Sequence, residues 1–127
     1  MQANVMDLRI DIMNEHREVF PNANKATQAL KYLEELVEFN DAQTNEERLD
    51  ELCDVFIVGC GMNRFDAKYS KFICEKSVAI MEIYFKCETD EDYKKNIYDR
   101  IKNLWDIKKK RPVKEIAPGE YRHLEDL

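Results

Sequence analysis

Apolar residues recur every three or four positions along most of this chain, a spacing that places them on one face of an α-helix. The pattern predicts five helices, over about residues 4–18, 24–41, 44–62, 66–87 and 90–110. Gly and Pro number only 3 each, so few positions would interrupt these helices. We therefore expect an all-α antiparallel bundle of four to five helices. It would form one domain over residues 1–111, followed by an extended tail over residues 112–127.

Polar residues at the expected helix starts support these boundaries, because Asn, Asp and Thr side chains accept hydrogen bonds from the first helical N–H groups. The candidate caps are Asn22 or Asn24, Thr44 with Glu47, Asp66, and Thr89 with Asp92. The third helix is apolar on two sides, which places it at the centre of the bundle. The second helix has a single apolar stripe, formed by Ala26, Ala29, Leu30, Leu33 and Val37.

Carboxylates interrupt the apolar pattern of the second and third helices. Glu35 and Glu38 are three residues apart, as are Glu51 and Asp54, so each pair shares a helix face. A short polar break between the two helices makes them antiparallel neighbours, and the two pairs then meet at similar heights. Four carboxylates this close cannot all stay ionised without a cation. Oxygen ligands alone suit Mg2+, with Mn2+ as an alternative. The competing interpretation is a solvated charged face.

The same acids carry a resemblance to a known family. Residues 34–38 read EELVE and residues 51–54 read ELCD. They resemble the EExxE and ExxD motifs of the MazG-like all-α nucleoside triphosphate pyrophosphohydrolases. The resemblance implies a Mg2+-dependent enzyme that converts a nucleoside triphosphate, here a deoxynucleoside triphosphate, to the monophosphate and pyrophosphate. It also implies a homodimer or homotetramer. The ligands implied for Mg2+ are Glu35, Glu38, Glu51 and Asp54, and the catalytic residues implied are Glu34, Glu35 and Glu38, with Glu34 in a supporting or water-activating role.

Contacts to the substrate are less well marked. Family members carry Lys, Asn and Arg on the helix after ExxD, and here Asn63 and Arg64 match only part of that pattern. The candidate substrate-binding residues are Lys31, Lys76, Asn96, Arg100, Lys102, Asn103 and Trp105. Trp105 could stack on a base, but we favour a place in the core. The basic run at residues 108–111 could meet polyphosphate. We favour a solvated helix end, where the helix dipole stabilises cations.

Charge and composition exclude several classes of partner. The first sixty residues carry 13 acidic and 5 basic side chains, which disfavours binding to a nucleic acid polymer. No apolar run reaches membrane-spanning length, and the first residues lack a secretory signal. The 4 cysteines form no CxxC pair and are expected to be reduced, buried thiols. A cytoplasmic location is therefore expected. Of the two histidines, His16 is expected at the surface.

Three other functions remain open from the sequence. A di-iron carboxylate bundle would require Glu-x-x-His motifs, and the histidines lie outside the acidic stretch. A non-catalytic helical module could bind a partner protein. A related pyrophosphohydrolase could act on a non-standard nucleotide such as phosphoribosyl-ATP. Self-association is also expected because helices four and five carry more large apolar residues than one small core covers, namely Phe72, Ile80, Tyr84, Ile97, Ile101 and Trp105.

Overall fold

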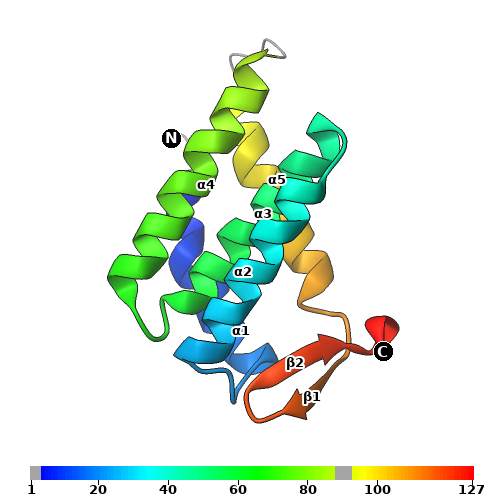
Figure 1. Cartoon of the computed structure of the whole chain (residues 1–127). Helices are drawn as coiled ribbons and strands as arrows, with labels where there is room; N and C mark the ends of the chain where they lie inside the picture. Colours follow the sequence, from blue (N-terminus) through cyan, green and yellow to red (C-terminus); the bar gives the residue numbers. More distant parts are fainter. Residues whose placement is uncertain (1–3, 88–92) are drawn as a thin grey trace.

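The computed structural model describes residues 4–87 and 93–127, which fold as a helical bundle with a small β-hairpin (Figure 1). The described helices are α1 (Leu8–Val19), α2 (Lys25–Asp41), α3 (Asn45–Met62), α4 (Ala67–Cys87) and α5 (Tyr93–Lys108). Short 3-10 turns cover Val5–Asp7 and Leu124–Asp126, and strands β1 (Val113–Ala117) and β2 (Glu120–His123) form the hairpin. The expected all-α bundle is confirmed. None of the described helices has the length and apolar character needed to cross a membrane.

Helix α3 is the centre of the bundle, as its two apolar sides predicted. It packs against α4, α2 and α1, and every residue from Val55 to Met62 is buried. Cys53, Phe56 and Cys60 are completely buried. The fold therefore holds the carboxylates of α3 on a helix whose second half is completely surrounded by the core.

Three of the expected helix caps are present. The Thr44 hydroxyl accepts a hydrogen bond from the Glu47 N–H at 3.1 Å, and Asp66 Oδ1 accepts one from the Tyr69 N–H at 2.9 Å. Asn24 caps α2 in a reciprocal arrangement with Thr27. The expected pair Thr89 and Asp92 lies outside the described residues.

The apolar stripe expected to bury α2 faces outward instead. Leu30, Leu33 and Val37 are 49 %, 56 % and 59 % exposed. The side of α2 that faces α3 carries Gln28, whose buried amide donates to the Val58 carbonyl at 2.8 Å, and Leu36, which packs against the core. The inward face is apolar but lies further round the helix than predicted: Ala29, Tyr32 and Leu36 pack against the core beside the buried Gln28.

The apolar surplus expected on α4 and α5 is mostly absent. Ile97, Ile101 and Trp105 are buried within their own chain, and among the residues named for that surplus only Phe72 is exposed. Ile83 of α4 and Ile107 of α5 are also exposed, as are Leu30, Leu33 and Val37 on α2.

The tail was expected to be extended and able to pack on the body through residues such as Tyr121, and residues 113–123 form an antiparallel hairpin. Tyr121 is buried on α1, with its ring 5.3 Å from that of Phe20, and its hydroxyl accepts a hydrogen bond from the Asn22 N–H at 2.9 Å. Gly119 at the turn has φ +78°, which glycine adopts without strain. A Cβ there would also lie 2.8 Å from the Asn22 carbonyl oxygen. The turn is therefore seated directly on the α1–α2 connection.

Candidate metal centre and its pocket

The antiparallel hairpin of α2 and α3 brings three of the four expected metal ligands together. Glu35, Glu38 and Glu51 each offer a carboxylate oxygen, and these oxygens all lie within 4.8 Å of one another. Glu38 is exposed, whereas Glu35 and Glu51 are partly buried. One turn on α2 thus faces one turn on α3, as the spacing of the two motifs predicted.

The electrostatics of the cluster are unfavourable for carboxylates alone. Oε2 of Glu35 and Oε2 of Glu51 are both buried and have no hydrogen-bond partner. Burial, with a further contribution from the Asp54 carboxylate, raises the pKa of Glu35 to about 9. Burial and a hydrogen bond with Glu38 raise the pKa of Glu51 to about 7. At neutral pH these side chains would be held partly protonated unless a cation compensates their charge.

Asp54, the fourth expected ligand, lies beside the cluster and is paired with a base. Its carboxylate accepts a hydrogen bond from the Lys108 ammonium at the end of α5, and only 13 % of its side chain is exposed. Burial raises the pKa of Asp54 even though Lys108 opposes the shift. Asp54 is thus close enough to influence Glu35 and Glu51 but is not one of the three converging carboxylates.

These features fit a hard divalent cation. Carboxylate oxygens are the preferred ligands of Mg2+ and Mn2+, and a cation would supply the partner that the two buried oxygens lack. Buried carboxylates are otherwise costly to maintain.

No family model, curated protein or solved structure matches this chain. The assignment of the site therefore rests on its geometry and on the motif resemblance.

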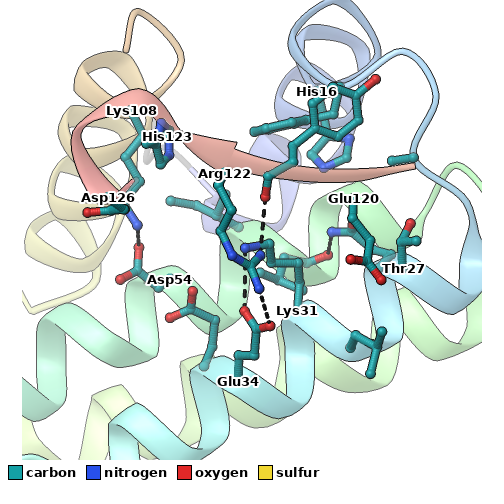
Figure 2. A pocket seen from close by; sticks show the side chains of 18 of the residues that line it. His16, Thr27, Lys31, Glu34, Asp54, Lys108, Glu120, Arg122, His123 and Asp126 are labelled. Atoms are coloured by element: carbon teal, nitrogen blue, oxygen red, sulfur yellow. Dashed lines mark hydrogen bonds and ion pairs between the residues drawn. The ribbon is translucent and has the colours of Figure 1, made fainter. Parts of the chain in front are cut away.

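A pocket of about 530 Å³ opens beside the acids. Glu35, Glu38 and Asp54 line one end of it. Apolar and aromatic side chains contribute to its wall, among them Phe20, Ile57, Val58, Trp105 and Tyr121, together with basic and further acidic residues. Strand β2 passes across the opening, with Arg122 pointing down toward Glu34 (Figure 2). The pocket has the size and mixed lining of a small-ligand site.

The structure divides the expected substrate-binding residues into two groups. Lys31 and Trp105 line the pocket. Trp105 is also 3 % exposed, and its indole N–H points to Glu15 Oε1 at 3.4 Å, so it is a core residue that forms part of the wall. The residues that do not line the pocket are Lys76, Asn96, Arg100, Lys102 and Asn103.

Several of those outlying residues have other partners. Arg100 donates to Glu46 and Asp50, near the start of α3, and Lys102 pairs with Asp106. The Lys76 ammonium lies 5.9 Å from the centre of the Phe72 ring. Spacing along a helix could not separate them from the pocket residues, because it does not show which face of α5 meets α3.

The pocket has basic residues that the sequence reasoning missed or set aside. Lys108 and Arg111 belong to the run interpreted as a solvated helix end, and Arg122 belongs to the tail. Glu34 lies at the rim, where its carboxylate accepts hydrogen bonds from Arg122 at 2.9 Å and from Lys31 at 3.4 Å. The basic run at residues 108–111 could have indicated a phosphate-binding site from the sequence, whereas no sequence pattern marked Arg122.

His16 is buried, which corrects its expected place at the surface. It is 4 % exposed, and burial lowers its pKa to about 3, so the imidazole is neutral. Its Nδ1 lies 3.0 Å from Arg64 Nη1, and because a guanidinium can only donate, Nδ1 is the acceptor. Arg64 also donates to the Phe20 carbonyl at 2.7 Å. Arg64 therefore links the end of α1 to the end of α3. It does not line the pocket, so its position does not match the phosphate-binding role that the family pattern suggested.

Proposed function

We propose that this protein is a divalent-cation-dependent hydrolase of nucleoside triphosphates of the MazG-like all-α type. The observation that carries the proposal is the convergence of Glu35, Glu38 and Glu51 within 4.8 Å, with two buried oxygens lacking partners. Glu35 and Glu38 of this cluster also line a pocket of about 530 Å³. Mg2+, with Mn2+ as an alternative, would be held by these three residues together with Asp54. When bound, the ion supplies charge neutralisation for phosphates and lowers the pKa of a bound water.

The chain itself supplies positioning and charge, which dominate phosphoryl chemistry. The phosphates would lie between the acids and the bases, and the nucleoside would lie against the apolar wall. Glu38 is the exposed member of the cluster, and it would accept the proton of an attacking water. Glu34 has a supporting role because it holds Lys31 and Arg122 at the rim. That the bond broken is the one between the α-phosphorus and the bridging oxygen follows from the family resemblance.

The direct test is a panel of nucleoside and deoxynucleoside triphosphates with Mg2+, in which released pyrophosphate and orthophosphate are scored separately. We expect pyrophosphate with at least one deoxynucleotide and none in EDTA. Glu38→Gln and Asp54→Asn should each remove turnover, whereas Glu75→Gln on the exposed side of α4 should retain it. Full activity in both cluster variants would refute the proposal. If pyrophosphate is released only from phosphoribosyl-ATP, the protein is a pyrophosphohydrolase of a non-standard nucleotide.

Self-association is the second part of the proposal. Leu30, Leu33 and Val37 form an exposed apolar stripe along α2, and such stripes mark surfaces that pack against another chain. Because Leu30 also lines the pocket, a second copy seated on the stripe would lie at its edge. A two-fold homodimer, or a homotetramer built from two of them, is the arrangement that we expect.

A further inference from the structure

The β-hairpin is anchored firmly enough to position a side chain over the pocket. Glu115 uses both carboxylate oxygens as acceptors, one for the Asn22 side chain at 2.9 Å and one for the Gly119 N–H at 2.8 Å. Tyr121 adds its buried ring and the hydrogen bond from the Asn22 backbone. These contacts join β1, the turn and β2 to the α1–α2 connection. Arg122, the next residue along β2, is consequently held at a fixed height above α2 (Figure 2).

Three basic residues of the pocket are paired with acids next to the metal cluster, whereas Arg111 pairs with Glu125. Arg122 donates to Glu34 on α2 at 2.9 Å, and Lys108 donates to Asp54 on α3. Glu34 also accepts from Lys31, so a single carboxylate is shared by two cations. Within this group of three side chains one carboxylate faces two cations, although Glu38 and Glu120 also line the pocket.

These ion pairs differ in how easily they separate. The side chains of Arg122 and Glu34 are 34 % and 44 % exposed, and ion pairs in that range add little stability because solvent screens them. Lys108 and Asp54 are less exposed, at 24 % and 13 %. An anion with several charges that enters the pocket can therefore replace Glu34 as the partner of Arg122 at small cost.

We propose that Arg122 on the hairpin is a polyphosphate-binding residue, acting with Lys108 on the phosphate oxygens of the substrate. When the phosphates bind, Arg122 exchanges Glu34 for a phosphate oxygen, and Lys108 exchanges Asp54 for another. Asp54 is then released toward the three carboxylates beside it. A cation that binds Asp54 frees Lys108 for phosphate, and a polyphosphate that binds Lys108 frees Asp54 for the cation. The two ligands therefore bind cooperatively, and each raises the affinity for the other by the same factor. A guanidinium suits this role because its planar fork matches phosphate geometry.

The test uses calorimetry of the whole protein with inorganic tripolyphosphate in the presence of Mg2+. Arg122→Gln should weaken tripolyphosphate binding by roughly 10- to 100-fold, the range expected for a lost charge-assisted hydrogen bond. The matched control is Lys114→Gln, which removes the same charge from the cross-strand partner of Arg122, an exposed residue outside the pocket lining. Its effect should stay within about twofold, because exposed charges are screened. Arg122→Lys should recover part of the affinity.

Three results would overturn the role of Arg122. The first is an equal loss of tripolyphosphate affinity in Arg122→Gln and Lys114→Gln, which would show that only the net charge of the hairpin matters. The second is no tripolyphosphate binding by the natural protein with Mg2+. Unfolding curves of each variant show whether the hairpin stays folded, and a normal curve with normal affinity in Arg122→Gln also excludes the role.

The role of Arg122 rests on the proposed function, and two measurements distinguish a failure of phosphate binding by Arg122 from a failure of the hydrolase proposal. Nucleotide turnover with an unchanged KM in Arg122→Gln would remove Arg122 and leave the hydrolase proposal intact. Arg122-dependent binding of tripolyphosphate without hydrolysis of any nucleotide would support the phosphate site and refute the hydrolase.

Discussion

Replacing Glu35 by glutamine should stabilise the protein in the absence of divalent cations. The folded state holds this carboxyl at a pKa of about 9, against an ordinary value of 4.5, chiefly because of burial and then because of Asp54. At pH 7 the chain must therefore take up a proton at Glu35 when it folds. Each pH unit between 4.5 and 7 costs about 1.4 kcal/mol, so the uptake costs about 3 kcal/mol. Glutamine has nearly the same shape and does not titrate. We expect Glu35→Gln to raise the free energy of unfolding by about 1–3 kcal/mol.

The sign of the pH dependence follows from the raised pKa. The contribution of Glu35 to stability is fully present below its ordinary pKa and is lost as the pH rises toward its folded value of about 9. In EDTA the natural protein should thus lose stability between about pH 5 and pH 9, and Glu35→Gln should lose less. Saturating Mg2+ should reverse the order. A ligand at 100 times its Kd adds about 2.7 kcal/mol to a protein that binds it, and the variant lacks one of the oxygen ligands.

Urea unfolding followed by far-UV circular dichroism measures these differences, with EDTA or Mg2+ at each pH. Glu75→Gln is the control, because its side chain is 54 % exposed and 3.8 Å from Lys71. The change there should stay within about 0.5 kcal/mol under all conditions. The reasoning about burial and like-charge repulsion fails if Glu35→Gln is the less stable protein in EDTA at pH 7. It also fails if both proteins show the same pH slope.

Three further changes test other parts of the structure. A Cβ at Gly61 would lie 2.5 Å from both His16 Nε2 and Gln28 Nε2, so Gly61→Ala should lower the free energy of unfolding by about 1–3 kcal/mol in urea, although alanine is the better helix former. Leu33 is 56 % exposed on the α2 stripe, and Leu33→Lys should yield a monomer by light scattering at micromolar concentration, where the natural protein should be larger; a monomeric natural protein would refute self-association. Trp105 is buried, so Trp105→Phe should reduce stability while leaving the ranking of the four deoxynucleotides unchanged, and a changed ranking would assign its ring to base stacking.

Local signals accounted for most of the helices and for the meeting of the acids. Caps such as Thr44 and Asp66 depend on side chains within three residues of the helix start, so the sequence contains all the information needed. The closeness of Glu38 and Glu51 required only a short connection and helical spacing. Both kinds of inference use distances that a helix fixes by itself.

The failures all concern contacts between elements far apart in the chain. The buried face of α2 was predicted incorrectly: Gln28 is buried against Val58, 30 residues away, while Leu33 is exposed. Arg122 reaches Glu34 across 88 residues, and no local pattern marks that pairing. The tail gave a turn signal in its Pro-Gly dipeptide, but turn residues alone do not show what the hairpin packs against.

The misassigned face of α2 and the acid cluster have a common physical basis. A helix selected only for stability would place Leu33 toward α3 and Glu35 toward solvent, because burying the carboxyl raises its pKa to about 9. The chain does the reverse, and the rest of the fold offsets the cost through the fully buried core around α3. Positions where local preference and burial disagree are expected at functional sites, since function is what keeps an unfavourable arrangement in place. On α2 that disagreement occurs at Glu35, next in the chain to Glu34, the residue that pairs with Arg122.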